Sequence, residues 1–370
     1  MKKPIRVAGM GKRGPLPGNR RKMLKWIRHR IAVGILKPGD RLPDRKALCR
    51  KFEVSICPVQ MAMNELIADG FVKAVSGHGT LVADPLPYAG KYLLLLRSRR
   101  DDAGVNLFAP ALRAAAAQVA AQRKVSFDVK ALIDEGPDSV PYAELKEEIR
   151  RHRYAGVFLQ GTSELTNDTD VVTNINDVPM VYFGKRTIRS QGDRAIPLRI
   201  WEGEGVEMLF GRHCADCRRH HCRRVAVIAP WTPGDGFREV VFAKVKEHGL
   251  EVVANGFHVV DMSHWDERQF RRLCKLFLSS DAGRAAEAVV LGDDNLLLPF
   301  AECCREALGA KAGRRYFVSC HCNFPLLPKC DFPSAFHGPD LVDAISSFVD
   351  YADDCRAGMR KPRPPRLNIV

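Results

Sequence analysis

The chain has 370 residues, 46% of them hydrophobic, which is enough to bury the cores of two or three domains. Its formal net charge is +15, yet residues 1–83 hold 18 of the 58 Lys and Arg side chains and only 5 of the 43 Asp and Glu side chains. The chain has no run of eighteen apolar residues and no apolar signal segment near its start, so we expect neither a membrane span nor export. Twelve cysteines without an export signal are typical of reduced thiols in the cytoplasm.

The first predicted element is a helix over residues 19–33, because Met23, Ile27 and Ile31 recur there at helical spacing. Residues 1–18 before it are rich in Gly, Pro and basic side chains. We expect a flexible basic arm in that segment.

Residues 44–80 predict two short helices followed by a hairpin. Asp44 is suited to cap the first helix, and Pro58 falls in the first turn of the second, where a missing N–H costs little. Gly70 ends the second helix, and residues 76–79 supply the hairpin turn. The second helix is expected to bury one apolar face, made of Val59, Met63, Leu66 and Ile67. This order of elements is an α+β winged helix-turn-helix, whose second helix is expected to enter a DNA major groove.

Three motifs follow one another in this region. Residues 34–43 read G-x-L-x-P-G-x-x-L-P, residues 66–72 read L-x-x-x-G-[LF]-[IV], and the wing carries G-x-G-T at residues 77–80. In this combination the region resembles the DNA-binding domain of the GntR family of bacterial transcription regulators. The charge asymmetry agrees, because a strongly basic head on a nearly neutral body is typical of proteins that bind the phosphate backbone.

The resemblance implies a set of DNA-binding residues. The family's common S-R-x-[TP]-V-R segment becomes SICPVQ at residues 55–60, so two arginines are absent. Gln60 remains able to read an adenine edge and Ser55 to bind a phosphate, while His78 either reaches the minor groove or is only an exposed turn residue. A head that has lost DNA binding is the alternative, and the retained positive charge argues against it. The predicted DNA-binding residues are Arg45, Lys46, Ser55, Pro58, Gln60, Gly77 and His78.

A Pro/Gly-rich linker at residues 84–90 separates the head, residues 19–83, from a body over residues 91–370. Strands and helices alternate in the body, which indicates an α/β fold with doubly wound parallel sheets. Its length suits two lobes with a ligand cleft between the carboxyl ends of their strands. The predicted strands are residues 92–96, 127–133, 156–159, 179–183, 225–229, 251–260, 288–291 and 316–320; the predicted helices are residues 107–123, 141–152, 203–213, 236–248, 266–280 and 295–308.

The body resembles the periplasmic-binding-protein-like effector domain of the LacI family, and head and body together are similar to arabinose-repressor-type regulators. Residues 106–108 resemble the family's N-P-F, residues 238–242 its R-x-x-G-[FY], and residues 292–294 its A-N-D. Because such residues contact a sugar in the family, the resemblance implies effector binding by Phe108, Lys185, Arg238, Asp293 and Asp294.

Several positions depart from that family pattern. Gly184 and Lys185 stand where Asp-Arg is common, Arg199 occupies an Asp position, and residues 320–322 read C-H-C in place of a Gly-aromatic-Asp motif. An acidic or phosphorylated sugar is therefore an alternative to a neutral one. The other alternative is that Arg238 and Asp294 are merely surface residues at helix starts.

The segment 213–222, HCADCRRHHC, has a C-x-x-C spacing with neighbouring histidines. It is interpreted as an elongated basic connector at the end of a helix, with zinc binding as the less favoured reading. This segment and residues 320–322 could also be sensitive to oxidation.

These patterns together predict a cytoplasmic, sequence-specific transcriptional regulator, a repressor rather than an activator, whose operator affinity is controlled by a sugar-like effector. We expect a homodimer on a palindromic operator, with no cofactor and no resident metal. A GntR-type head fused to an enzyme is the alternative, although the chain has no P-loop, no G-x-S-x-G and no G-x-G-x-x-G after a strand. A redox- or metal-responsive DNA-binding regulator is a further alternative.

Overall fold

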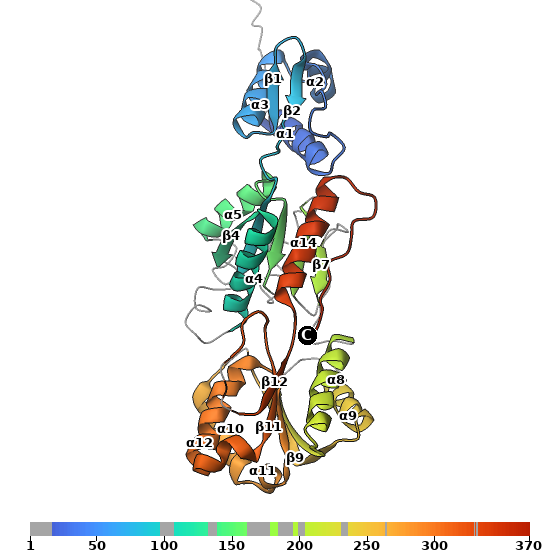
Figure 1. Cartoon of the computed structure of the whole chain (residues 1–370). Coiled ribbons are helices and arrows are strands. Elements are labelled where there is room, and N and C mark those ends of the chain that lie inside the picture. The colour runs from blue at the N-terminus through green and yellow to red at the C-terminus, as the bar shows by residue number, and fades with distance from the viewer. Residues whose placement is uncertain are drawn as a thin grey trace, which may run out of the picture.

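The computed structural model describes residues 17–96, 107–131, 139–160, 178–183, 195–198, 204–230, 236–262, 265–328, 330 and 332–370. A small head, a first lobe and a second lobe follow one another along the long axis of the molecule (Figure 1). Lys185, Arg199 and the arm up to residue 16 lie outside the described residues. Within those ranges, every helix is too short or too polar to cross a lipid bilayer.

The head consists of α1 (Pro17–Ala32), α2 (Arg45–Phe52), α3 (Ile56–Ala68) and an antiparallel hairpin of β1 (Val72–Val75) and β2 (Gly79–Val82). The predicted winged helix-turn-helix is therefore confirmed. The expectation for Ile67 was wrong: its side chain is 41% exposed, because it lies about 100° around α3 from the buried Leu66. The buried core of the head includes Met23, Ile27, Leu48, Val59, Met63, Leu66, Phe71 and Val82.

The first lobe is built on a five-stranded parallel sheet in the order β4-β3-β5-β6-β7. Alternate residues of its central strand β3 face opposite sides: Leu94 packs with α4 and α14, whereas Leu93 and Leu95 pack with α5. This alternation explains the continuous apolar run that the sequence shows there. The bounds are β3 (Lys91–Leu96), α4 (Phe108–Arg123), β4 (Ser126–Ala131), α5 (Val140–Arg150), β5 (Gly156–Leu159), β6 (Met180–Phe183), β7 (Ala195–Leu198) and α14 (Leu341–Arg356).

The second lobe has a parallel sheet in the order β12-β11-β10-β8-β9, with α8 and α9 on one face and α10, α11 and α12 on the other. The two-lobed α/β body with parallel sheets agrees with the predicted fold class. The bounds are α8 (Glu204–Arg219), β8 (Arg224–Pro230), α9 (Phe237–Glu247), β9 (Glu251–Val260), α10 (Glu267–Ser279), α11 (Asp281–Ala285), β10 (Ala288–Leu291), η3 (Asp294–Leu296), α12 (Leu297–Leu308), η4 (Gly309–Lys311), α13 (Ala312–Arg315), β11 (Phe317–His321) and β12 (Ser334–His337).

Two parts of the body differ from the sequence prediction. The helix expected to end at residue 213 continues to Arg219, so most of the segment interpreted as a connector is helical. The long helix α14, the short helices α11 and α13, and the edge strands β7 and β12 were not predicted from the sequence.

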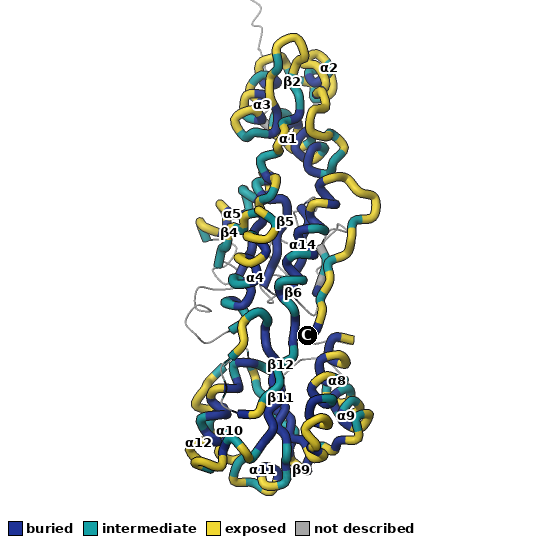
Figure 2. Tube along the Cα trace, in the orientation of Figure 1, coloured by how far each residue is buried: buried dark blue, intermediate teal, exposed yellow. Residues whose placement is uncertain are grey.

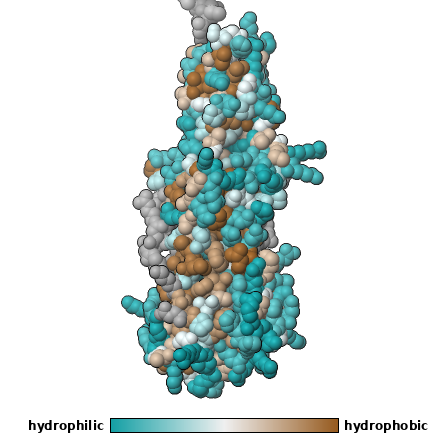
Figure 3. Space-filling view, in the orientation of Figure 1, coloured by the Kyte–Doolittle hydropathy of each residue, from teal (hydrophilic) through white to brown (hydrophobic). Residues whose placement is uncertain are grey.

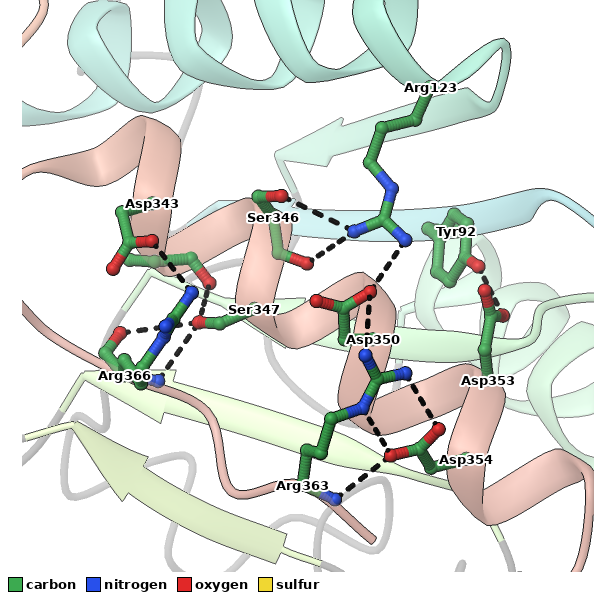
Figure 4. Close-up of polar contacts among 11 residues, drawn as sticks. Tyr92, Arg123, Asp343, Ser346, Ser347, Asp350, Asp353, Asp354, Arg363 and Arg366 are labelled. Atoms are coloured by element: carbon green, nitrogen blue, oxygen red, sulfur yellow. Dashed lines mark hydrogen bonds and ion pairs between the residues drawn. The ribbon is translucent and has the colours of Figure 1, made fainter.

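Helix α14 carries the chain from the second lobe back into the first, and residues 357–370 then return along it in the opposite direction. Arg363 near the start of this return pairs with Asp354 at 2.8 Å, and Arg366 further along pairs with Asp343 at 3.1 Å (Figure 4). The backbone of Val370 exchanges two hydrogen bonds with Gly338, just before α14 begins. We call residues 357–370 the return segment. The return segment and α14 lie antiparallel to each other along the first lobe.

The head contacts the first lobe at the C-terminal end of α14. Arg356, only 7% exposed, donates to the backbone carbonyls of Ala32 in the head and of Tyr154 and Ala155 in the lobe, at 2.8 to 3.3 Å. Its guanidinium also stacks on the ring of Tyr88 in the linker, 4.6 Å from the centroid. In Figure 2 the tube is buried along the central strands of both lobes and largely exposed over the head.

A second contact joins head and lobe on another side. Asp69, which follows α3, pairs with Arg153 of the lobe at 2.5 Å and with Arg28 of α1. The hydroxyl of Tyr88 donates to the carbonyl of Ile31. Head and first lobe are therefore joined by polar contacts beside the linker as well as by the linker itself.

Candidate nucleic-acid interface and effector site

The turn between α2 and α3 is set by local backbone chemistry. Asp44 caps α2, since its carboxylate accepts from the backbone N–H of Ala47 at 2.7 Å. Glu53 ends α2 in the left-handed conformation, with φ of 53°, which lets α3 start at an angle only two residues later. Ser55 occupies the N-cap of α3 without a side-chain capping bond, and it is exposed, as a phosphate contact requires.

Gln60, which was predicted to read a base edge, is half-exposed on α3. Its side-chain amide donates to Oδ1 of Asn64, one turn further along the helix, at 2.7 Å. Pro58 is different: its ring is buried within the head. The structure thus corrects the prediction for Pro58, which packs inside the domain and does not present its side chain to DNA.

Helix α3 contains no Lys or Arg, so the cations of the head lie on other elements. Arg45 and Lys46, which were predicted to bind DNA, are exposed in the first turn of α2. Trp26 of α1 is flanked by two further cations, with Lys51 4.6 Å and Arg30 4.9 Å from the ring centroid. These stacked cations form a basic edge on α1 and α2.

The wing keeps its predicted shape because glycines occupy positive φ. Gly77 has φ of 76° and Gly79 has φ of 87°, which strain other residues. His78 between them is exposed, and its Nδ1 donates to the carbonyl of Ser76 at 3.1 Å. Arg41 lies against Gly79, since a Cβ there would come within 3.2 Å of its Nε. Sequence reasoning missed Arg41, although it lies within the approach motif.

Phe108 and Asp293 each lie next to a contact between the two lobes. Phe108 begins α4 and packs against Phe183 at the end of β6, with ring centroids 5.1 Å apart. Its neighbour Leu107 donates a backbone N–H to Oδ1 of Asn295 in the second lobe at 3.2 Å. Asp293 holds that asparagine in place by accepting from its backbone and side-chain nitrogens. Two of the predicted effector residues therefore lie on opposite sides of one seam.

Asp294 is buried directly beside Asp293. Its Oδ2 accepts from the backbone and side chain of Asn323, while its Oδ1 meets no hydrogen-bond partner within the described residues. Burial, followed by the charge of Asp293, raises the pKa of Asp294 to about 7. Burial also raises the pKa of Asp293. Such a pair can both accept and donate hydrogen bonds near neutral pH, which suits a polyhydroxyl ligand.

Arg238 is exposed, and its guanidinium lies over two rings, 5.2 Å from the centroid of Phe242 and 5.4 Å from that of Phe257. Phe257 pairs with Val227, three residues before the end of β8, so Arg238 lies beside the sheet rather than beyond its edge. The link across the lobes runs from Leu107, next to Phe108, through Asn295 to Asp293, whereas Arg238 contacts Phe242 and Phe257. A cavity of about 700 Å³ between β9, α10 and α11 is lined by none of the predicted residues.

The thiols of the 213–222 segment belong to the core of the second lobe. Cys214 and Cys217 are buried on α8, and burial raises the pKa of both well above that of a free thiol. His213 on the same helix contacts the hydroxyl of Ser319 at 2.7 Å. Within the part of the chain that the structure describes, no three His, Cys, Asp or Glu side chains are grouped to hold a metal ion.

Comparison with known proteins assigns the head. Residues 22–82 match the model of the gntR family of bacterial regulatory proteins. The mannosyl-D-glycerate transport/metabolism system repressor MngR of Escherichia coli K12 is 39% identical over 64 residues, which are 17% of this chain and 27% of that protein. An uncharacterized HTH-type regulator of Bacillus subtilis, YdfD, is 32% identical over 62 residues, 17% of this chain and 13% of that protein. The chain therefore spans about a quarter, or less, of the curated relatives it matches.

The body resembles solved structures of transcription regulators, one of them named as a member of the LacI family. A regulator of Arthrobacter sp. FB24, in complex with lactose, has a TM-score of 0.54 at 12% identity, over 75% of this chain and 97% of that one. CcpA of Lactococcus lactis has a TM-score of 0.52 at 13% identity, over 76% and 97%. The protein thus combines a DNA-binding head with a two-lobed body of the fold that these regulators share. The head is a GntR-type helix-turn-helix domain, and the body has the LacI-type fold.

Proposed function

We propose that this protein is a transcriptional repressor that binds an operator through its head. Its affinity for the operator changes when a sugar or sugar derivative binds between its lobes. The observation that carries the proposal is the direct contact between a GntR-type head and a LacI-type two-lobed body. The relatives support it, since MngR is named as a repressor and a structural neighbour is in complex with lactose.

On the DNA side, the proposal assigns phosphate contacts to Arg45, Lys46 and Ser55, a base contact to Gln60, and minor-groove contacts to the wing at Gly77 and His78. All of these residues are exposed or half-exposed on the head. We include Arg41 because it lies against the wing. Two heads in a homodimer would engage the two halves of a palindromic operator.

On the effector side, the proposal assigns contacts to Phe108, Asp293 and Asp294 at the seam between the lobes. Arg238 can join them only by leaving its two rings, which costs about 0.5–1 kcal/mol for an exposed cation–π contact. A sugar held across the seam stabilises one relative position of the lobes, and this differential affinity is what an effector needs to change operator binding.

The test combines two measurements on the full chain. A thermal-shift screen with neutral sugars, sugar acids and sugar phosphates should raise Tm for one class, because a ligand that binds only the folded state stabilises it. The same compound should change affinity for DNA enriched by in vitro selection. Selection without any enriched sequence, combined with no compound that raises Tm, would refute the proposal.

A further inference from the structure

The exposed face of the recognition helix α3 carries no charge. Its largest exposed side chains are apolar: Ile56 is 54% exposed and Met61 is 50% exposed. The single charged residue of the helix, Glu65, pairs with Arg28 of α1 at 3.1 Å. Any attraction of this head to phosphates must therefore come from other elements.

The two polar side chains of that face, Gln60 and Asn64, lie in line with Ile56. Ile56, Gln60 and Asn64 follow at intervals of four residues and therefore lie above one another on the helix. The hydrogen bond between Gln60 and Asn64 orients the amide of Gln60 and leaves its Oε1 and one N–H available. Met61 lies on the neighbouring stripe.

The surroundings of this apolar face indicate what covers it. It belongs to the second helix of a helix-turn-helix, whose first helix α2 carries the exposed cations Arg45 and Lys46. Figure 3 shows apolar side chains over the α3 side of the head, among hydrophilic neighbours. A nucleic-acid groove offers both an apolar group, the 5-methyl of thymine, and the phosphates that the flanking cations attract.

We propose that the head reads its operator chiefly through thymine methyl groups, contacted by Ile56 and Met61, and through one adenine edge, contacted by Gln60 that Asn64 orients. This inference rests on the proposed function, because it requires that the head binds DNA specifically. It assigns sequence discrimination to α3 and electrostatic affinity to α2 and the wing. It follows that the contacted positions of each half-site are A·T pairs.

The experiment uses the full chain and DNA selected in vitro with it. Each thymine of the selected site is replaced in turn by deoxyuridine, which lacks only the 5-methyl group. We expect at least one replacement in each half-site to weaken binding about fourfold, the effect of uncovering one buried methyl-sized group. Ile56→Ala or Met61→Ala should bind more weakly and lose its sensitivity to deoxyuridine at the matching position, as a coupled pair does.

The amide pair has its own readout. Gln60→Ala should reduce discrimination at one A·T pair by about five- to a hundredfold. Asn64→Ala should give a partial loss at the same pair, and both variants should keep the salt dependence of the wild type. Ile35→Ala is the matched control, since Ile35 is 52% exposed but lies in the approach loop, and it should leave all of these values unchanged.

Three results would overturn the inference while leaving the proposed function standing. Specific binding that is indifferent to deoxyuridine at every thymine is the first. Equal loss of affinity of Ile56→Ala for selected and random DNA is the second. A change of oligomeric state in Ile56→Ala or Met61→Ala, with DNA binding unchanged, is the third and would assign the face to a protein contact. No specific binding to any DNA would instead refute the proposed function.

Discussion

Arg356 is the residue on which the junction between head and body depends. Replacing it by Ala leaves the carbonyls of Ala32, Tyr154 and Ala155 without their donor, at about 1–3 kcal/mol for each one that water does not reach. We expect Arg356→Ala to lower Tm by several degrees and to weaken operator binding, both measured on the full chain. Arg360→Ala is the control, because Arg360 is exposed nearby. If Arg356→Ala and Arg360→Ala behave alike, the junction does not depend on this guanidinium.

Asp294 makes the stability of the folded protein depend on pH. Its pKa is raised in the folded state to about 7, so the folded protein binds more protons than the unfolded one between about pH 4 and 7. Stability therefore falls as pH rises through that window. Asp294→Asn cannot ionise, so its Tm relative to the wild type should rise by about 2–4 °C or more between pH 5 and pH 8. Thermal unfolding at both pH values checks this, and a constant difference between the two would contradict it.

Individual residues were predicted unevenly from the sequence. Arg45 and Lys46 are exposed and Gln60 is half-exposed, because their position in the motif fixes which side of the helix they occupy. Pro58 was misjudged because a sequence motif records that a residue recurs and not whether it contacts DNA or the core. Arg238 has aromatic partners from α9 and β9, and only the folded chain brings the strand to it.

Among the elements, α8 and α14 show where sequence reasoning failed. The end of α8 contains a C-x-x-C spacing and a run of Arg and His, which resembles a loop, yet Cys214 and Cys217 continue the buried stripe of Phe210. Helix α14 was missed because its sequence is rich in acidic and hydroxyl side chains. Asp340 caps this helix, and Leu341, Ile345 and Phe348 are buried on one side of it. The cations that neutralise α14 come from distant segments, so its local sequence appears too polar to be buried.

The return segment is held to α14 mainly by arginines, and its ion pairs are of unequal strength. Arg363 reaches Asp354 twice at 2.8 Å, and the side chain of Asp354 is only 7% exposed, so its carboxylate depends on this partner. Arg366 pairs with the more exposed Asp343. We expect Arg363→Ala to lower Tm more than Arg366→Ala does, since an unpaired buried carboxylate is costly whereas an exposed pair contributes about 1 kcal/mol or less. The reverse order in thermal unfolding would contradict this.

At the scale of the whole molecule, the contacts beside the linker bear on whether the body is independent. We expect residues 84–370 alone to fold, to remain dimeric in light scattering and to bind no DNA. Their Tm should be lower than that of the body within the full chain, because removing the head uncovers Tyr88 and deprives Arg356 and Arg153 of partners. An unchanged Tm would show that the contacts between head and body contribute no stability.

The meeting of Gly34 and Gly358 has a consequence for exchanging heads between regulators. A Cβ on Gly34 would lie 2.5 Å from the backbone nitrogen of Gly358, and a Cβ on Gly358 would lie 2.9 Å from the carbonyl oxygen of Val33. The two backbones can therefore approach this closely only because both residues are glycines. Gly34 opens the approach motif, which means that a foreign head carrying the same motif arrives with the required glycine in place. A chimera built on this body should therefore accept heads that have glycine at the position of Gly34 and reject heads that have a side chain there. Compatibility between modules would thus be decided by the absence of one carbon atom on each side, rather than by the sequence of the linker.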